Sequence, residues 1–497
     1  MTARKKIPLL SKSRFMSGLQ CHKRLYLELF QPELAATITA DQQAIFDQGT
    51  AVGIEAREFV PGGVPVEADH LHHREAVEQT ASLLADRKVP AIYEAGFLHD
   101  DVRVRADILA RVRGGKYDLY EVKSSTQFKE EHLWDVAIQT HVLRGAGVPL
   151  RRANLLLINT DYVYPGGPYD HQQLFYPVDL TADVEAVLPE IPHLLRDIRA
   201  DLAGDAPPAI PVGDHCTSPY ECPFIEQCWP PPVPYAVDQL YRAGAKLKAQ
   251  LAEDGIASIR EIPADYPGLS PLNQRIRDAI ISGEAYRDGA TRDVMAALAR
   301  PVRFMDFETF SPALPLFAGT RPYQAIPFQW SVHALQADGT VRHDAYLHED
   351  HDDPRHGFLA SLLQVLGKRG SICVYSSYEQ TQLKALREAF PEHAEAIDAV
   401  IARLVDLLPV VRNHIYHPDF GGSFSIKSVY PALVPASGYD GLTITDGSSA
   451  SVAYATLLAG ALPPADAQQV RQDLLDYCNQ DTEALLALYH HLAGDSP

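Results

Sequence analysis

A run of prolines near the middle of the chain sets the strongest limit on how this sequence can fold. Four of the five residues from Pro230 to Pro234 are proline, and proline lacks the backbone N–H group that helices and inner strands require. A chain of 497 residues is also too long for one ordinary hydrophobic core. We therefore expect separate domains on the two sides of this run.

The hydrophobic pattern changes along the chain in the same way. Residues 1–232 and 299–497 mix strand-like and helical segments, whereas residues 233–298 have the pattern of short helices and loops. We expect an α/β protein with one α/β domain over 1–232, a helical connector over 233–298 and a second α/β domain over 299–497.

Composition favours a globular, cytoplasmic protein. The chain is 46% hydrophobic and 22% charged, which is typical of globular domains. No stretch approaches the ~20 apolar residues of a membrane span, and no apolar run follows the basic N-terminal residues as it would in a signal peptide. The net charge of −20 argues against nonspecific coating of nucleic acid, but carboxylate metal sites would add negative charge to an enzyme that acts on it.

Half of the six cysteines lie in one short segment. Cys216, Cys222 and Cys228 are spaced C-x5-C-x5-C. In a cytoplasmic protein such clustering favours metal binding or catalysis over disulfides, yet three thiolates are one ligand short of a closed site. The residues alone leave open an iron–sulfur cluster, zinc and buried free thiols, although zinc sites usually contain closer C-x2–4-C pairs.

A predicted hairpin carries the first acidic pattern. Apolar and polar residues alternate on both sides of the tetrapeptide RGGK, with Asp107 expected at the end of one strand. Glu121 and Lys123 lie two residues apart on the next strand and so share a face, and a helix follows that contains Gln139 and ends at Gly145. Two carboxylates and a lysine suit phosphodiester hydrolysis assisted by Mg²⁺ or Mn²⁺. The alternative is an exposed hairpin with a Glu–Lys pair.

A second acidic pattern lies in the last part of the chain. Asp306 and Glu308 interrupt the apolar segment RFMDFETF and point the same way from a strand, and Glu379 stands at a strand-to-helix turn. Tyr477 and Asp481 lie one turn apart on the last helical segment. Buried like charges are costly unless a cation neutralises them, so these positions together suggest a cation site. The alternatives are an ordinary strand end and a solvated helix face.

The first constellation resembles the core of RecB-like nucleases of the PD-(D/E)XK superfamily. The match is carried by RADIL, LYEVKSS and DVAIQ. The resemblance implies a restriction-endonuclease-like fold in which Asp107 and Glu121 bind Mg²⁺ or Mn²⁺. It also implies catalytic roles for Lys123 and Gln139.

One branch of these nucleases, which includes the CRISPR-associated exonucleases, places the core between one N-terminal cysteine and a cysteine triplet. The segment GLQCHKRLYLEL supplies such a cysteine at Cys21. The resemblance implies a 4Fe-4S cluster that ties the two ends of the domain together. Its ligands would be Cys21, Cys216, Cys222 and Cys228.

The second constellation resembles the DnaQ-like 3′–5′ exonucleases of the ribonuclease H-like fold. The shared patterns are D-x-E, Y-E-x3-L and Y-x3-D, with SFSIKSVYPAL between the last two. The resemblance implies that Asp306, Glu308 and Asp481 are metal ligands and that Glu379 is a further catalytic acid. Tyr477 would position the attacking water or help to deprotonate it.

A few positions depart from these family patterns. Gly53 stands where many RecB-like nucleases have a metal-binding His, with Glu55 as a nearby substitute, and Leu143 stands where a Tyr is usual. Glu379 replaces the Asp of the DnaQ-like pattern. We expect Cys478, beside the proposed catalytic tyrosine, to belong to the core.

The whole chain resembles a bacterial family of unknown function that fuses an iron–sulfur RecB-like nuclease to a DnaQ-like exonuclease domain. This resemblance implies a metal-dependent nuclease with two active sites that acts on nucleic acid, with single-stranded DNA favoured and RNA possible. The alternatives are an RNA exonuclease and a nucleic-acid-binding scaffold with one or both sites inactive. A protein partner could deliver the substrate to so acidic a chain.

Overall fold

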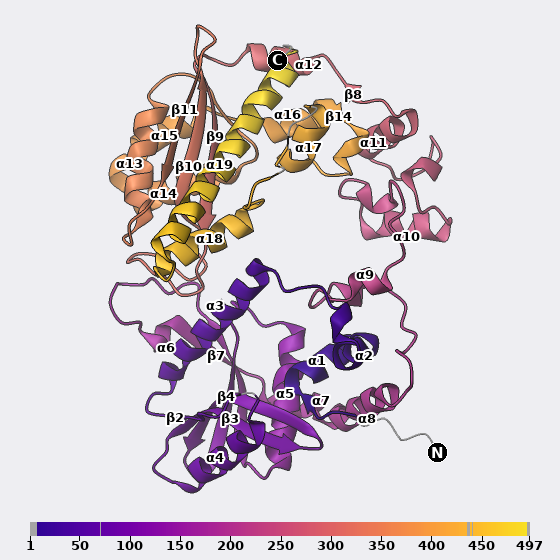
Figure 1. Cartoon of the computed structure of the whole chain (residues 1–497), viewed down its shortest axis with the longest axis vertical. Helices are drawn as coiled ribbons and strands as arrows, with labels where there is room; N and C mark the ends of the chain where they lie inside the picture. The colour runs from indigo at the N-terminus through magenta and orange to yellow at the C-terminus, as the bar shows by residue number, and fades with distance from the viewer. Residues whose placement is uncertain (1–6, 70, 435–437, 440, 495–497) are drawn as a thin grey trace. The chain divides into compact units, whose positions relative to one another are not determined.

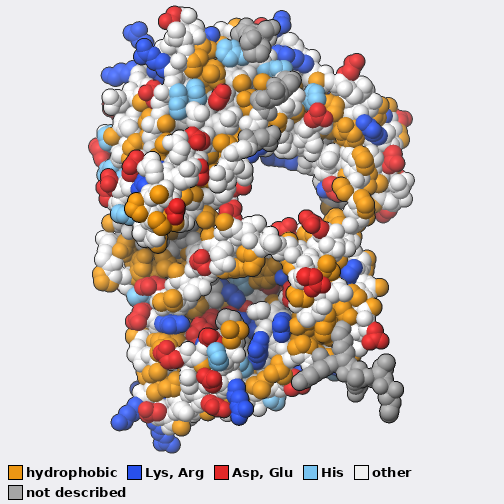
Figure 2. Space-filling view, viewed as in Figure 1, with side chains coloured by type: hydrophobic (Ala, Val, Ile, Leu, Met, Phe, Trp, Pro, Cys, Tyr) orange, Lys and Arg blue, Asp and Glu red, His pale blue; other side chains and the backbone are white. Residues whose placement is uncertain are grey.

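The structure is a computed structural model that describes residues 7–69, 71–434, 438–439 and 441–494 (Figure 1). The chain groups into two compact units, of which unit 1 comprises residues 1–230 and 312–324, and unit 2 comprises residues 231–311 and 325–497. Both contain helices and mixed sheets, which confirms the expected α/β class. In the described part of the chain, no helix is both long and apolar enough to cross a bilayer. On the face drawn in Figure 2, acidic and basic side chains are intermixed.

Unit 1 is built on a seven-stranded sheet. The strand order is β2-β3-β4-β5-β6-β7, and β1 pairs with β4. The neighbours β3, β4 and β5 are antiparallel, β6 runs parallel to β5, and β7 is antiparallel to β6. The strands are β1 (Leu10–Ser11), β2 (Val64–Pro65), β3 (Ala91–His99), β4 (Val102–Val112), β5 (Lys116–Val122), β6 (Leu150–Ile158) and β7 (Phe175–Asp179).

Helices surround this sheet and close two hydrophobic clusters. One cluster joins the sheet to α1, α5 and α8, and the other joins it to α3. The helices are α1 (Lys12–Gln20), α2 (His22–Phe30), α3 (Ala40–Ala56), α4 (His73–Ala85), α5 (Glu130–Gly145), α6 (His171–Leu174), α7 (Thr181–Val187), α8 (Ile191–Leu202) and α9 (Ile225–Cys228).

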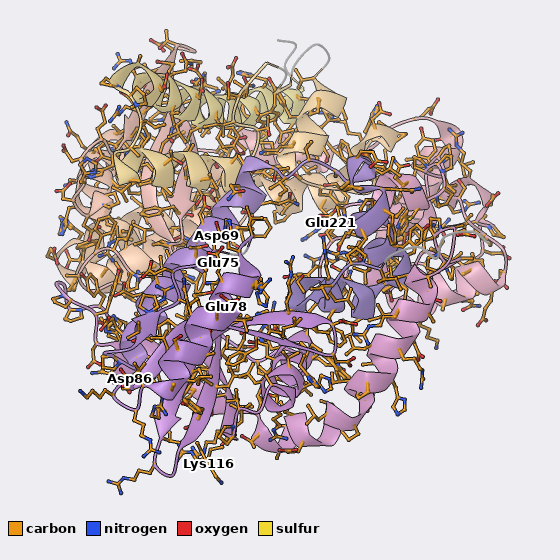
Figure 3. All side chains as sticks on the ribbon, turned by 60° about the horizontal axis from the view of Figure 1, so that its bottom comes forward. Asp69, Glu75, Glu78, Asp86, Lys116 and Glu221 are labelled. Carbon is orange, nitrogen blue, oxygen red and sulfur yellow. The ribbon has the colours of Figure 1, made fainter. Side chains whose placement is uncertain are left out.

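The alternating segment around RGGK forms the β4–β5 hairpin, as predicted. Gly114 and Gly115 have φ angles of 81° and 71° at its turn, which glycine adopts without strain. Lys116 begins β5 next to this turn, and its side chain points outward (Figure 3). The prediction that Asp107 ends its strand is wrong. It lies in the middle of β4, because the strand continues to Val112 by pairing with both β3 and β5.

Unit 2 is built on a five-stranded sheet in the order β11-β10-β9-β12-β13, with a separate two-stranded pair β14-β8. The neighbours β9, β10 and β11 are antiparallel, while β12 runs parallel to β9 and β13 runs parallel to β12. The strands are β8 (Tyr286–Arg287), β9 (Val302–Phe310), β10 (Ile326–Leu335), β11 (Val341–Leu347), β12 (Ile372–Val374), β13 (Leu404–Asp406) and β14 (Ile415–Tyr416).

The sheet of unit 2 has helices on both faces. Met305 and Phe307 of β9 belong to a cluster with helices α13 to α15, whereas Phe304 contacts Tyr489 of α19 with 5.4 Å between ring centres. Helix α19, yellow in Figure 1, lies along β9 and β10. The helices are α10 (Ala245–Glu253), α11 (Pro271–Ser282), α12 (Ala290–Ala296), α13 (Pro354–Leu366), α14 (Tyr378–Ala389), α15 (Ala394–Ile401), α16 (Leu407–His414), α17 (Ile426–Leu433), α18 (Gly447–Ala459) and α19 (Pro464–Ala493).

Residues 233–298, interpreted from sequence as a connector, contain α10, α11 and α12. Their buried side chains, among them Leu251 and Ile276, share one hydrophobic cluster with Phe304 of β9 and Leu488 of α19. This segment therefore contributes to the core of unit 2.

Replacing Phe358 with Ala should destabilise unit 2. Phe358 is fully buried on α13 and contacts Phe307 edge to face, with 4.9 Å between ring centres. Its loss leaves a cavity, and we expect the free energy of unfolding to fall by about 3–5 kcal/mol. Val341→Ala on the edge strand β11, where the side chain is 44% exposed, should change it by less than about 0.5 kcal/mol. Urea denaturation measures both, and equal effects would contradict the predicted core position.

Candidate functional site

The acidic residues of unit 2 meet where β9 faces α19. Asp306 and Glu308 alternate with Met305 and Phe307, so they lie on the face opposite the α13 cluster. Asp481 comes from α19, one turn after Tyr477. Together with Lys427 at the start of α17, these four side chains line one pocket. The structure thus brings together residues that are separated by up to 175 positions in the sequence.

Burial makes this cluster of acids electrostatically costly. Glu308, Asp481 and Glu379 are 5%, 7% and 3% exposed. Burial first, and then the charges of the neighbouring acids, raise the pKa of Asp306 and Glu308 well above their ordinary values. Burial also raises the pKa of Asp481 and brings that of Glu379 to about 7. A cation in this pocket would remove much of this cost.

Glu379 lies in the first turn of α14, as its sequence position predicts, and is close enough to Asp306 for its charge to raise the pKa of that carboxyl. Its Oε2 atom is buried without a hydrogen-bond partner in the described structure. A buried carboxylate oxygen that has no protein partner suits a metal ligand. The donor set of unit 2 therefore fits Mg²⁺ or Mn²⁺, which prefer carboxylate oxygens.

Two residues that we did not predict complete the site of unit 2. Lys427 Nζ donates to Tyr477 Oη at 2.9 Å and to Thr445 O at 2.5 Å. Tyr439 Oη donates to Asp481 Oδ1 at 2.6 Å. Lys427 lies within the SFSIK segment that the family resemblance includes, but no spacing in the sequence points from it or from Tyr439 to Asp481.

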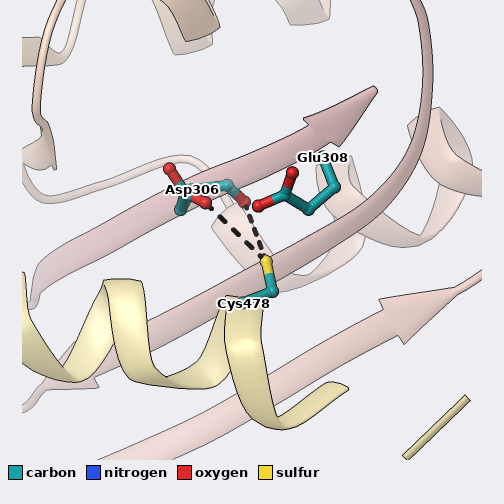
Figure 4. A group of neighbouring side chains, drawn as sticks. All are labelled: Asp306, Glu308 and Cys478. Carbon is teal, nitrogen blue, oxygen red and sulfur yellow. Dashed lines mark hydrogen bonds between the residues drawn. The ribbon is translucent and has the colours of Figure 1, made fainter. Parts of the chain in front are cut away.

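Cys478 is buried, as expected for a core residue, but its thiol faces the acids. Its Sγ atom lies 3.8 Å from Asp306 Oδ2 (Figure 4). Three potential ligand atoms, one from each of Asp306, Glu308 and Cys478, lie within 4.8 Å of one another. Burial, followed by the charge of Asp306, raises the pKa of the thiol well above its ordinary value. A protonated thiol is a poor ligand, so the carboxylates are the better candidates for binding a hard cation.

The acids of unit 1 lie opposite each other on neighbouring strands. The antiparallel register that pairs Ile108 with Tyr120 brings Asp107 opposite Glu121. Asp107 Oδ2 accepts a hydrogen bond from the backbone N–H of Val122 at 2.7 Å. Glu121 is buried, with 1% of its surface exposed. The predicted pair of carboxylates is therefore adjacent in the structure.

Glu121 is surrounded by donors. Lys123 Nζ donates to its Oε1 atom at 2.8 Å, and Gln139 Nε2 of α5 donates to its Oε2 atom at 2.6 Å. Lys12 Nζ of α1 also donates to Oε1, at 2.5 Å. Asp135 of α5 forms ion pairs with both lysines. Sequence analysis missed Lys12 and Asp135, because their proximity depends on how α1 and α5 pack against the sheet.

The two lysines determine the direction in which the pKa of Glu121 is shifted. Burial alone would raise the pKa of Glu121, but Lys12 and Lys123 outweigh it and hold that pKa well below its ordinary value. Burial would lower the pKa of both lysines, yet Glu121 and Asp135 hold these pKa values high. Asp107 is different, since burial and the charge of Glu121 raise its pKa.

The donor set of unit 1 also fits a divalent ion. Asp107 and Glu121 supply carboxylate oxygens, and Gln139 Oε1 is buried with no hydrogen-bond partner in the described structure. Amide and carboxylate oxygens are ligands that Mg²⁺ and Mn²⁺ accept.

The departures from the family pattern lie elsewhere in unit 1. Glu55 Oε1 pairs with His171 Nε2 at 2.7 Å, and Gly53 has open space where a side chain would begin. Leu143 is fully buried in the core. The structure does not bring Glu55 into hydrogen-bond contact with Asp107 or Glu121 among the described contacts.

A pocket in unit 1 is lined by four cysteines, together with Lys23 and Arg24. All four are free thiols. Cys21 ends α1, 195 positions before the nearest of the other three. Burial raises the pKa of the Cys222 thiol. The cysteines are Cys21, Cys216, Cys222 and Cys228.

Comparison with known proteins finds one family. A family described as "Domain of unknown function (DUF2779)" matches residues 303–425. The match includes β9 with its two acids and Glu379 of α14, and it ends before Lys427 and α19. No match was found among curated proteins. This segment, which lies in unit 2 except for residues 312–324, is therefore similar to the DUF2779 domain.

Replacing Asp306 with Asn should stabilise the metal-free protein. The substitution removes one of several buried like charges, and we expect the free energy of unfolding in EDTA to rise by about 1–3 kcal/mol. Mn²⁺ at a hundred times its Kd should stabilise the wild type by about 2.7 kcal/mol, and the variant by much less. Asp476→Asn, on the exposed side of α19, is the control and should change neither value. Destabilisation of Asp306→Asn in EDTA would contradict this account.

Proposed function

We propose that this chain is a metal-dependent nuclease that hydrolyses phosphodiester bonds of nucleic acid, with one active site in each unit. The observation that carries the proposal is the pocket of unit 2, where Asp306, Glu308 and Asp481 converge from β9 and α19 beside Tyr477. Acids in a D-x-E strand and a Y-x3-D helix are the arrangement that the resemblance to DnaQ-like exonucleases implies. We infer a ribonuclease H-like domain with 3′–5′ exonuclease activity.

The residues of unit 2 have distinct roles in this proposal. Divalent ions, when bound, activate the attacking water and offset the charge of the phosphate. Burial and the charge of Asp481 raise the pKa of Tyr477 far above its ordinary value, so we infer that this phenol orients the water and stays protonated. Lys427 donates to the phenol oxygen, which leaves the phenol proton for Asp481 or for a water. Lys427 also supplies a positive charge beside the phosphate.

We propose that unit 1 is a RecB-like nuclease domain. Asp107 and Glu121 would hold the divalent ion, and Gln139 fixes the Glu121 carboxylate through a 2.6 Å hydrogen bond. Lys123 would orient the water or stabilise charge on the phosphate, because its ammonium group touches the same carboxylate. Single-stranded DNA is the favoured substrate and RNA the second candidate.

We propose that the four thiols bind a 4Fe-4S cluster. Their meeting in one pocket supports a shared ligand, and Lys23 and Arg24 at its wall suit an anionic cluster. In a tetrahedral zinc site with Zn–S bonds of ~2.3 Å, the sulfur atoms lie about 3.8 Å apart. Among the described residues no three of these thiols lie within 4.8 Å of one another. The thiols are therefore not arranged as a closed zinc site in this structure.

Cleavage of end-labelled single-stranded DNA and RNA tests the two sites separately. In Mn²⁺ or Mg²⁺ we expect Asp306→Asn or Asp481→Asn to remove shortening from the 3′ end. Asp107→Asn or Glu121→Gln should remove a different set of products, each by at least about 100-fold. Asp476→Asn and Glu130→Gln replace exposed acids on the same helices as Asp481 and Gln139 and should cleave like the wild type.

Three outcomes would change the conclusion. Equal rates in all variants would refute both active sites. Binding without cleavage at any Mn²⁺ or Mg²⁺ concentration would favour a nucleic-acid-binding scaffold. Cleavage of RNA alone would favour an RNA exonuclease.

Removing a single thiol tests the cluster. Anaerobically purified protein should absorb near 400 nm, as 4Fe-4S proteins do, and should contain about four iron and four sulfide ions per chain. Cys21→Ser and Cys222→Ser should lose colour and iron, because each removes one of four ligands. Cys373→Ser, on buried strand β12, is the matched control and should keep both. A colourless protein with one zinc ion per chain would overturn the cluster.

A further inference from the structure

Helix α1 connects the carboxylate site of unit 1 to the thiol pocket. It runs from Lys12 to Gln20, and nine residues span about 13 Å. Lys12, at its first position, contacts Glu121. Cys21, which ends the helix, lines the thiol pocket.

The first end of α1 is fixed by the sheet. Strand β1 precedes the helix directly, and its residues Leu10 and Ser11 pair with β4, the strand that carries Asp107. Leu10 is 1% exposed, and the Ser11 hydroxyl caps the helix by accepting from the Arg14 N–H at 3.2 Å. The start of α1, with Lys12, is therefore held beside Asp107 and Glu121.

The C-terminal end of α1 is fixed by the loop that carries Cys216, Cys222 and Cys228, which we call the cysteine loop. Gln20 Nε2 donates to the backbone oxygens of His215 at 2.7 Å and Tyr220 at 2.6 Å. His215 and Tyr220 lie on either side of Cys216 and before Cys222. Figure 3 labels Glu221, which belongs to the same loop. The loop that holds three thiols therefore also holds the end of α1.

The body of α1 packs too closely to shift without cost. Phe15 is fully buried in the core. A Cβ atom on Gly18 would come within 2.9 Å of side-chain atoms of both Leu25 and Ile198. Because protein interiors have little free volume, a displacement at one end of α1 would be transmitted to the other.

Lys12 occupies a lone pair of the Glu121 carboxylate that a metal ion would need. The Glu121 carboxylate has about four lone-pair sites, and Lys12, Lys123 and Gln139 already donate to three of them. Lys12 also pairs with Asp135 Oδ1 at 3.2 Å. A divalent ion bound by Glu121 must therefore compete with an ammonium group.

We propose that Lys12 is a positioning residue that holds the Glu121 carboxylate until a divalent ion displaces it, and that the cysteine loop holds Lys12 in place through α1. The state of the thiol site would thereby regulate metal binding at Asp107 and Glu121. This inference rests on the metal site of unit 1 in the proposed function.

Mn²⁺ binding to the full-length chain tests the inference without any cleavage assay. Asp306→Asn with Asp481→Asn first removes the site of unit 2, and free Mn²⁺ is then counted by electron paramagnetic resonance. Lys12→Met should tighten binding at unit 1 by about tenfold, because it removes a nearby positive charge. Lys12→Arg should restore the wild-type Kd. Lys116→Met, at the outward-facing end of β5 (Figure 3), is the matched control and should have no effect.

A double-mutant cycle tests the role of α1. Gln20→Ala removes both bonds to the cysteine loop and should tighten Mn²⁺ binding severalfold in the presence of Lys12. In the Lys12→Met background the same change should have no effect, because the residue through which it acts is gone. Ser13→Ala, exposed on the same helix, should leave the Kd unchanged in both backgrounds.

The outcomes separate this inference from the proposed function. Unchanged or weaker Mn²⁺ binding in Lys12→Met would overturn it, as would absence of Mn²⁺ binding to unit 1. Equal effects of Gln20→Ala in both backgrounds would overturn the coupling through α1. Tighter Mn²⁺ binding in Lys12→Met with no cleavage by any variant would support the inference and refute the nuclease.

Discussion

The central physical constraint in unit 2 is the burial of several carboxylates side by side. Asp306, Glu308 and Asp481 face one pocket, and Lys427 is the one lysine or arginine among the described residues that line it. A sheet and a long helix that served stability alone would place apolar side chains here, as they do next to it at Phe304 and Tyr489. The unfavourable charge is therefore best understood as a cost retained for binding cations.

In unit 1 the buried carboxylates are instead paired with lysines. There Glu121 and Asp135 are compensated by Lys12 and Lys123, which lie within salt-bridge distance. Of these three acids, Asp107 has no ion pair among the described contacts, and burial, followed by the charge of Glu121, raises its pKa. The lysines of unit 1 thus offset most of the charge of its acids, whereas the acids of unit 2 have only Lys427 beside them in the described pocket.

Local patterns were sufficient to predict most of the candidate residues, but not their full surroundings. The two-residue period of β9 and the helical spacing of Tyr477 and Asp481 are visible in the sequence, and the structure brings them together. Lys12 meets Glu121 across 109 positions, a proximity that only the packing of α1 on the sheet creates. Residues 312–324 likewise group with unit 1, where Tyr323 Oη donates to Ser124 O, although no boundary in the sequence marks this segment.

Under the proposed coupling, the position of Lys12 gives the thiol pocket a role beyond stability. A cluster that only joined the ends of a domain could be attached to any secondary-structure element. Here Cys21, the first ligand of the proposed cluster, ends the helix whose first residue touches Glu121, and Gln20 ties that helix to the loop of the other three cysteines. Since a helix of nine residues that packs into the core through Phe15 and Gly18 moves as one body, loss of the proposed thiol ligand would alter the charge next to Asp107 and Glu121 as well as the stability of the domain. In the proposed nuclease, stability and metal binding in unit 1 are then linked through the same short helix.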